Sequence, residues 1–219
     1  MLKAVLFDMD GVIVDSEPIH YKAYHCMFRD INIEVSNTLY QSFTGQSTLN
    51  ICKQLCLEYN LYEAPETLVS IKRKYFMYLF ENDSDFKLIN GVLNLIKDYH
   101  NNGLKLVLAS SASMTTINNI FTRFNLDQYF VAKLSGADLK ASKPHPEIFE
   151  KAAKASGSKT SECMVIEDST NGIIAANKAK IFCVAFNSPH SKNQDYSLAN
   201  MVINDFNEVS YAAISTTFN

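Results

Sequence analysis

The sequence lacks a long apolar run and an excess of one charge, and we expect no secretion signal. No segment approaches the ~20 consecutive apolar residues of a membrane-spanning helix, and only four apolar residues directly precede Asp8. The formal net charge of -3 leaves no basic footprint for nucleic acid. We therefore expect a cytoplasmic protein that has neither a membrane nor a nucleic acid as its partner.

Paired cysteine motifs, internal repeats and low-complexity segments are also missing. The five cysteines are odd in number and form no Cys-x-x-Cys motif, which predicts a reducing compartment rather than a disulfide framework. Cys52 and Cys56 share an apolar helical stripe with Leu49 and Tyr59, which favours core packing over metal binding. At 219 residues, the chain can form one α/β domain or a domain with a large insertion.

The most informative segment present is the run from Ala4 to Phe7, followed by Asp8, Asp10 and Gly11. Four apolar residues without alternation predict a strand that is buried on both faces. The carboxyl ends of such strands form the ligand-binding edge of open α/β sheets. Two carboxylates on one short turn repel each other, so the pair indicates either a hard cation or a shifted pKa. The alternative is a pair of aspartates that cap the next helix.

Residues 15–85 are predicted to be helical. The segment Asp15 to Pro18 is a helix-start signal, and helices are expected over 48–59 and 65–81. The polar run 81–85 is expected to lead the chain back to the core. The apolar face of the helix over 65–81 is predicted to consist of Leu68, Ile71, Tyr75, Tyr78 and Leu79.

Beyond residue 85, apolar strands alternate with amphipathic helices. This rhythm predicts a Rossmann-like, doubly wound, mostly parallel α/β sheet. We expect a core made of residues 1–14 and 86–219, with the helical segment 15–85 inserted after the first strand. The later strands are expected near 104–109, 132–135, 163–166, 181–185 and 201–203, and the helices near 92–99, 117–124, 146–156 and 171–179.

Polar side chains follow three further strands. Ser110, with the Ser111 amide behind it, offers donors for phosphate oxygens, although a plain helix N-cap is the alternative. Lys143 lies in a proline-flanked loop and could neutralise phosphate charge, although a single lysine is usually a surface charge. Glu167 and Asp168 end the fourth strand and would complete a carboxylate cage for Mg²⁺.

These motifs, in this order, resemble those of the haloacid dehalogenase superfamily over essentially the whole chain. The closest resemblance is to the β-phosphoglucomutase-like branch, which includes small sugar-phosphate phosphatases, and the helical insertion is similar to that family's C1-type cap. The motifs are Asp8-Met9-Asp10-Gly11-Val12, Ala109-Ser110-Ser111, Ser142-Lys143-Pro144 with Pro146-Glu147-Ile148-Phe149, and Ile166-Glu167-Asp168-Ser169 with Gly172.

The resemblance implies phosphoryl transfer through an aspartyl phosphate. Asp8 would be the nucleophile, and Asp10 would protonate the leaving oxygen and then activate water. That role leads us to expect a raised pKa for Asp10, favoured by burial and a neighbouring carboxylate. The implied catalytic residues are Asp8, Asp10, Ser110 and Lys143. The implied Mg²⁺ ligands are Asp8, the Asp10 carbonyl group, Asp168 and, directly or through water, Glu167.

The cap residues distinguish this sequence from its nearest relatives. By resemblance, His20 would help to position Asp10, although a surface histidine is the alternative. Mutases of this branch carry a lysine before the cap glycine and an arginine after it, where this chain has Thr44 and Thr48. The missing cations weaken the grip on a second phosphate and favour hydrolysis. The predicted substrate-contacting residues are His20, Thr44, Gly45, Gln46, Ser47 and Ser111.

We therefore predict a Mg²⁺-dependent phosphatase that acts on a small phosphorylated metabolite, with a sugar phosphate as the favoured class, and we expect a monomer. The first alternative is a β-phosphoglucomutase-type phosphosugar mutase. The second is a phosphate-binding or phospho-accepting regulatory protein, against which the presence of Asp10 and of the cap argues.

Overall fold

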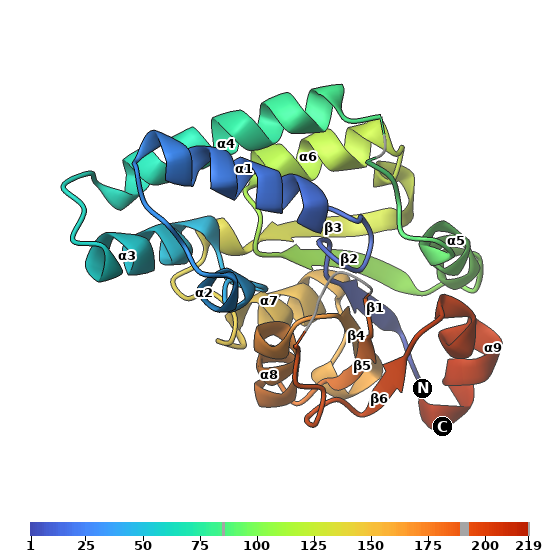
Figure 1. The fold of residues 1–219 in the computed structure, drawn as a ribbon. Helices are drawn as coiled ribbons and strands as arrows, with labels where there is room; N and C mark the ends of the chain where they lie inside the picture. The colour runs from blue at the N-terminus through green and yellow to red at the C-terminus, as the bar shows by residue number, and fades with distance from the viewer. Residues whose placement is uncertain (85, 189–192, 219) are drawn as a thin grey trace.

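A single parallel sheet forms the centre of the protein (Figure 1). The computed structural model describes residues 1–84, 86–188 and 193–218, so Asp85 at the end of the predicted linker lies outside it. Within the described residues, six strands follow the order β3-β2-β1-β4-β5-β6, and every neighbouring pair is parallel. The predicted doubly wound α/β architecture is confirmed, because the chain starts in the middle of the sheet and builds outward in both directions.

The element bounds agree with most of the predictions. The strands are β1 (Ala4–Phe7), β2 (Lys105–Ser110), β3 (Phe130–Ser135), β4 (Cys163–Glu167), β5 (Phe182–Phe186) and β6 (Met201–Ile203). The α-helices are α1 (Glu17–Asp30), α2 (Asn37–Gln41), α3 (Thr48–Glu58), α4 (Pro65–Asn82), α5 (Val92–Asn101), α6 (Met114–Arg123), α7 (Glu147–Ser156), α8 (Thr170–Lys178) and α9 (Tyr211–Ile214). Along the described ranges, no helix combines the length and apolar character needed to cross a membrane.

The short helix α2 was not predicted from the sequence. It has five residues, little more than one turn, so it cannot display an apolar period. Its start depends on a local contact, because the hydroxyl group of Ser36 accepts a hydrogen bond from the backbone N–H of Leu39 at 3.2 Å. The strand β3 also begins at Phe130, two residues before its predicted start.

β1 is buried on both faces, as its sequence predicts. Val5 and Phe7 belong to the apolar cluster that α5 and α6 also build, whereas Ala4 and Leu6 belong to the cluster shared with α7 and α8. Successive strand residues point to opposite faces, so a strand covered on both sides requires an unbroken apolar run. This burial fixes the position of the residues that follow β1.

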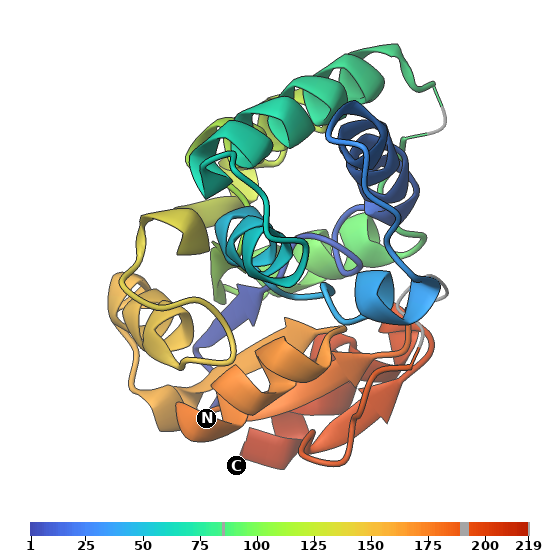
Figure 2. The ribbon, with the colours of Figure 1, turned by 60° about the vertical axis from the view of Figure 1, so that its left-hand side comes forward.

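The helices α1 to α4 gather on one side of the sheet in both ribbon views (Figures 1 and 2). They share an apolar cluster of their own, which includes Met27, Leu55 and Leu68. The predicted apolar face of α4 is only partly confirmed: Leu68 is buried, and Ile71, Tyr75 and Leu79 pack partly buried against the apolar clusters, but Tyr78 is 65% exposed. The buried residues of α4 are Leu68, Val69, Lys72, Phe76 and Phe80. A hydrophobic pattern predicted the face only in part because a lysine occupies one of the buried positions.

Both connections between these helices and the core run side by side. Val14 pairs with Leu88 in an isolated antiparallel bridge, and the backbone N–H of Ile89 donates to the carbonyl oxygen of Ile13 at 2.9 Å. On the return connection, Arg123 of α6 donates hydrogen bonds to backbone carbonyl groups, including that of Asp83 at 3.0 Å. The two connections are therefore fixed to the core at neighbouring points.

Candidate active site

The ends of β1 and β4 bring three buried acidic side chains together. Asp8 follows β1, Glu167 ends β4 and Asp168 comes next. Because β1 and β4 are adjacent and parallel, one carboxylate oxygen from each residue lies within 4.8 Å of the other two. Oxygen ligands in this arrangement suit a hard divalent cation such as Mg²⁺. The fourth predicted ligand, the carbonyl group of Asp10, belongs to the same turn as Asp8.

Two glycines allow the chain to pack against these carboxylates. Gly11 has a φ of +81°, and a Cβ atom there would lie 1.9 Å from Oδ2 of Asp168. A Cβ atom at Gly172, in α8, would lie 1.7 Å from Oε1 of Glu167. Real atoms cannot approach so closely, so any side chain at either position would displace an acid of the cluster.

Lys143 supplies a buried positive charge to the acidic cluster. Its Nζ atom donates to Oδ1 of Asp8 at 2.5 Å and to Oε1 of Glu167 at 2.6 Å. Burial lowers the pKa of Lys143, but the two carboxylates outweigh this effect and raise it. Burial also raises the pKa of Asp8, against the opposing charge of Lys143. A cation among the carboxylates would favour the ionised form of Asp8.

Glu167 is held in place by several donors. Its Oε2 atom accepts hydrogen bonds from the backbone N–H groups of Asp168 and Ser169 and from the Ser169 hydroxyl group, each at 2.9 Å. Together with the bond from Lys143, these contacts engage both of its oxygens. Glu167 therefore positions Lys143 in addition to facing the cluster.

Asp10 lies in a different environment from Asp8. The hydroxyl group of Ser16 donates to Oδ1 of Asp10, and Nε2 of His20 lies 3.3 Å from the same oxygen. Burial raises the pKa of Asp10, but the hydrogen bonds from His20 and Ser16 and the nearby charge of Lys72 outweigh it, so the pKa is lowered. The expected rise is therefore wrong for this structure, because the helical segment surrounds Asp10 with donors and positive charge.

Lys72, which was not predicted from the sequence, is part of this site. Lys72 is only 3% exposed, and its Nζ atom lies 2.7 Å from Nδ1 of His20. The same atom lies over the rings of Tyr24 and Phe76, 4.9 and 4.7 Å from their centroids. Burial lowers the pKa of Lys72 to about 8. No sequence signal identified it, because a lysine within a helix is normally exposed and its partner is distant in sequence.

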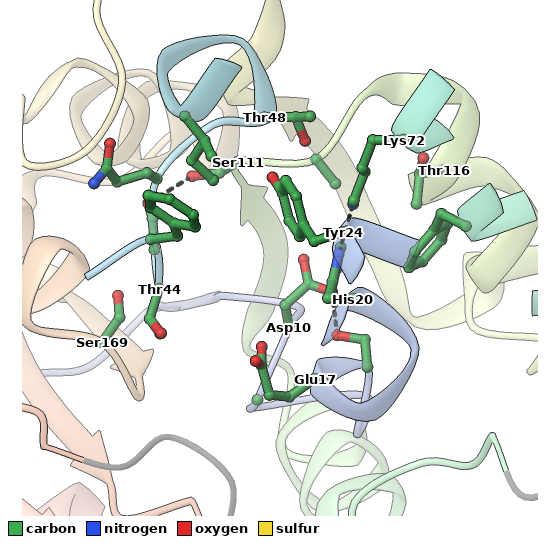
Figure 3. Close-up of a pocket in the computed structure, with 18 of the residues that line it drawn as sticks. Asp10, Glu17, His20, Tyr24, Thr44, Thr48, Lys72, Ser111, Thr116 and Ser169 are labelled. Carbon is green, nitrogen blue, oxygen red and sulfur yellow. Dashed lines mark hydrogen bonds and ion pairs between the residues drawn. The ribbon is translucent and has the colours of Figure 1, made fainter. Parts of the chain in front are cut away.

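A cavity of about 110 Å³ separates this catalytic edge from the helical segment (Figure 3). This volume is small compared with the roughly 300–1,000 Å³ of typical drug-sized ligand sites, which suits a small metabolite. The predicted residues that line it are Asp8, Asp10, His20, Thr44, Gly45, Gln46, Ser111 and Asp168. Lining residues that the sequence analysis did not single out for the substrate include Glu17, Tyr24, Tyr40, Lys72, Arg73 and Thr116.

Four of the predicted site residues lie outside this lining: Lys143 and Glu167, which are buried behind Asp8, and the two serines Ser110 and Ser47. Ser110 is fully buried, and its hydroxyl group accepts a hydrogen bond from the backbone N–H of Ala112 at 3.1 Å. Ser47 caps α3, where its hydroxyl group accepts the N–H of Asn50 at 3.3 Å. Both hydroxyl groups therefore bind local backbone, and that of Ser47 also accepts a hydrogen bond from the Ser142 hydroxyl group at 3.0 Å. The catalytic role of Ser110 and the substrate contact of Ser47 stay predictions.

The loop before α3 rests directly on the core and forms part of the cavity wall. The hydroxyl group of Ser111 donates to the carbonyl oxygen of Gly45 at 3.2 Å, and the side-chain amide of Asn171 donates to that of Thr44 at 3.1 Å. Gly45 has a φ of +77°, and a Cβ atom there would lie 2.5 Å from the hydroxyl oxygen of Ser169. This close approach requires glycine.

Comparisons with known proteins agree with this geometry. Residues 5–186 match the family model described as haloacid dehalogenase-like hydrolase. The chain is 26% identical over 207 residues to hexitol phosphatase B of Escherichia coli O157:H7, covering 94% of this chain and 93% of that protein. It is 29% identical over 197 residues to 6-phosphogluconate phosphatase of Escherichia coli strain K12, covering 87% of this chain and 86% of that protein.

The fold agrees with a solved structure over its full length. The β-phosphoglucomutase of Clostridium difficile matches with a TM-score of 0.87 and 26% identity, covering 100% of this chain and 98% of that one. The predicted fold and the predicted enzyme class are thus confirmed. The chain belongs to the haloacid dehalogenase-like hydrolase family, as its four strand-end motifs predict.

Proposed function

We propose that this protein is a Mg²⁺-dependent phosphatase that hydrolyses a small sugar phosphate through an aspartyl phosphate on Asp8. The observation that carries the proposal is the buried contact between Asp8 and Lys143 beside the acidic cluster, where Asp8 also lines a small cavity. The relatives named as phosphatases support the same reaction.

In the first half of the proposed reaction, a carboxylate oxygen of Asp8 forms a bond to phosphorus. The bond between phosphorus and the leaving oxygen breaks, and Asp10 gives its proton to that oxygen. The negative charge of the bound phosphate would raise the pKa of Asp10 from its lowered value, which favours the protonated form at this stage.

In the second half, water attacks the phosphorus atom and the bond to Asp8 breaks, which releases inorganic phosphate. Asp10 accepts the proton of the attacking water. The lowered pKa of Asp10 suits this role as a base. Lys143 stays between the nucleophile and Glu167 and balances the negative charge of both.

The acidic cluster fits the proposed metal. Asp8, Asp168 and the carbonyl group of Asp10 would hold Mg²⁺, with Glu167 as a direct or water-mediated ligand. When bound, the ion would offset the repulsion between the carboxylates and the phosphate. The close packing of Gly11 against Asp168 supports this assignment, because it keeps a side chain out of the site.

A phosphate-release assay tests the proposal. Sugar phosphates, other phosphomonoesters and pyrophosphate would be supplied with and without Mg²⁺ to the wild type and to Asp8→Asn. We expect Mg²⁺-dependent release that Asp8→Asn abolishes, whereas the control Asp138→Asn, at an exposed position, keeps it. No turnover of any ester, or equal turnover in Asp8→Asn, would refute the proposal.

Mutase activity is the second candidate, and the similarity to β-phosphoglucomutase favours it. The cap loop argues for hydrolysis, because Thr44 and Thr48 line the cavity where mutases of this branch have cations. The two reactions separate when β-glucose 1-phosphate is supplied with a bisphosphate primer. Glucose 6-phosphate as the main product would favour the mutase, and free phosphate would favour the phosphatase.

We also propose that residues 15–85 act as a cap domain over a core of residues 1–14 and 86–219. The separate apolar cluster of α1 to α4 and the loop contacts over the cavity support this division. Crosslinking between cysteines introduced at Thr44 and Asn171, in a variant without the native cysteines, tests it. Reversible loss of turnover on crosslinking is expected, and full turnover in the crosslinked protein would contradict a cap that opens.

A further inference from the structure

The cavity contains a carboxylate that the proposed reaction does not use. Glu17, the first residue of α1, lines the cavity next to Asp10, and Figure 3 shows the two side chains close together. The negative charge of Asp10 contributes to the raised pKa of Glu17, after the larger effect of burial. Glu17 is only partly exposed, so its side chain is part of the cavity wall rather than a freely solvated surface group.

Tyr40 holds the Glu17 carboxylate in one orientation. The hydroxyl group of Tyr40, in α2, donates to Oε1 of Glu17 at 2.9 Å. Within the described residues, Oε2 of Glu17 has no hydrogen-bond partner in the protein. The carboxylate is therefore positioned by one oxygen and able to accept a ligand's hydrogen bond with the other. Burial raises its pKa, which marks the environment as partly desolvated.

The surroundings indicate what such a ligand would be. Two carboxylates, Glu17 and Asp10, repel an anionic group near the reacting oxygen. Of the two cations in the lining, Lys72 is already bound to His20 and Arg73 is exposed to solvent. A carboxylate accepts hydrogen bonds and donates none when ionised, so it selects groups that bear hydrogen. Neutral hydroxyl groups satisfy both conditions.

We propose that Glu17 determines specificity by accepting a hydrogen bond from a hydroxyl group of the leaving alcohol. The substrate class is then the phosphate monoester of a neutral, polyhydroxylated alcohol, with a hydroxyl group close to the ester oxygen. This inference rests on the proposed phosphatase function and assigns to Glu17 the recognition of its substrate's hydroxyl group. A site built to bind a substrate hydroxyl group discriminates strongly against an analogue that lacks it.

Two esters of equal chain length and charge test this inference. Sorbitol 6-phosphate carries hydroxyl groups along the chain, whereas hexyl phosphate carries none. We expect the ratio of their kcat/KM values to fall by about 10- to 100-fold in Glu17→Gln, because a hydrogen bond to a charged group is lost. An unchanged ratio, including an equal loss of kcat/KM on both esters, would overturn the inference. Glu17 would then only stabilise the fold or affect Asp10.

Three further measurements make the result specific. Tyr40→Phe keeps the Glu17 carboxylate but removes the hydrogen bond that orients it, so the ratio of kcat/KM values should fall less than in Glu17→Gln. Glu34→Gln, at an exposed position, should leave the ratio unchanged. Thermal unfolding shows whether each variant is folded. A ratio that falls equally in Glu34→Gln would contradict a specific role for Glu17.

Binding measurements separate this inference from the reaction itself. Calorimetric titration measures the affinity of both esters for Asp8→Asn and for the double variant Asp8→Asn/Glu17→Gln. The double variant should lose affinity for sorbitol 6-phosphate but not for hexyl phosphate. If the wild type releases phosphate from neither ester but this binding selectivity is present, the proposed function fails and the inference stands. If Glu17→Gln leaves the binding ratio unchanged, the inference fails whatever the turnover.

Discussion

Replacing Lys72 with methionine should stabilise the fold while it impairs the site. Burial lowers the pKa of Lys72 from its ordinary value of 10.5 to about 8. At about 1.4 kcal/mol per pKa unit, the charged side chain destabilises the folded state by about 3 kcal/mol. The cation–π contacts to Tyr24 and Phe76 are lost as well, and each is worth roughly 0.5–2 kcal/mol. Because the pKa shift already contains part of that attraction, we expect the free energy of unfolding of Lys72→Met to exceed that of the wild type by about 1–3 kcal/mol.

The stability gained by Lys72→Met should depend on pH. Folded wild type releases the Lys72 proton near pH 8, whereas the unfolded chain keeps it until about pH 10.5. Between these values the unfolded chain binds more protons, so the stability of the wild type rises with pH. The advantage of Lys72→Met is therefore full below pH 8 and shrinks toward pH 10.5. The charged or titratable groups near Lys72 are Asp10, Glu17, His20, Cys52 and Arg73.

Urea unfolding at pH 7 and pH 9.5 measures the effect. Lys74→Met is the matched control, because Lys74 is exposed on the same helix and should change stability by less than about 0.5 kcal/mol. Turnover of Lys72→Met should fall about tenfold or more, since His20 loses its partner beside Asp10. Lower stability than wild type at pH 7, or a difference that does not shrink at pH 9.5, would refute the desolvation argument.

Three other predictions concern the acidic cluster. Gly11→Ala should raise the Mg²⁺ concentration needed for half-maximal turnover at least about tenfold, because its Cβ atom displaces Asp168. The control Gly103→Ala has a similar φ of +79° but open space around the Cβ atom, so it should leave this concentration unchanged. Equal effects of the two variants would assign the loss to backbone strain. Lys143→Met should lower the free energy of unfolding in urea by about 3–5 kcal/mol at pH 7, because Asp8 and Glu167 lose their partner. The loss should be smaller at pH 5, where the unpaired carboxylates take up protons. An unchanged stability would contradict the buried contacts. Chelation by EDTA should abolish turnover, and Mg²⁺ should restore it; turnover that survives chelation would argue against the metal.

The arrangement of the catalytic edge could be predicted because it depends on topology. In a doubly wound sheet, residues that follow parallel strands meet at one edge, whichever residues connect the strands. Asp8, Glu167 and Asp168 lie together for this reason, and Lys143 reaches them from the loop that its prolines indicated. Their roles in the reaction remain predictions that the proposed assays test.

The parts that could not be predicted depend on helix packing. The inner face of α4 includes Lys72, so a pattern based on apolar residues predicted that face only in part. The lowered pKa of Asp10 depends on His20 and on this lysine, which pair only after α1 and α4 have packed together. The helix α2, which brings Tyr40 to Glu17, is too short to show a period.

The sequence by itself determined the family, the parallel core and the acids at its edge, because apolar runs and the polar residues after them are local signals. Only the tertiary structure decided the charge environment of Asp10 and the composition of the cavity wall. Lys72 is 52 residues from His20, and Tyr40 is 23 residues from Glu17. Such contacts depend on which faces of the helices meet, and side-chain packing across the whole segment fixes that choice.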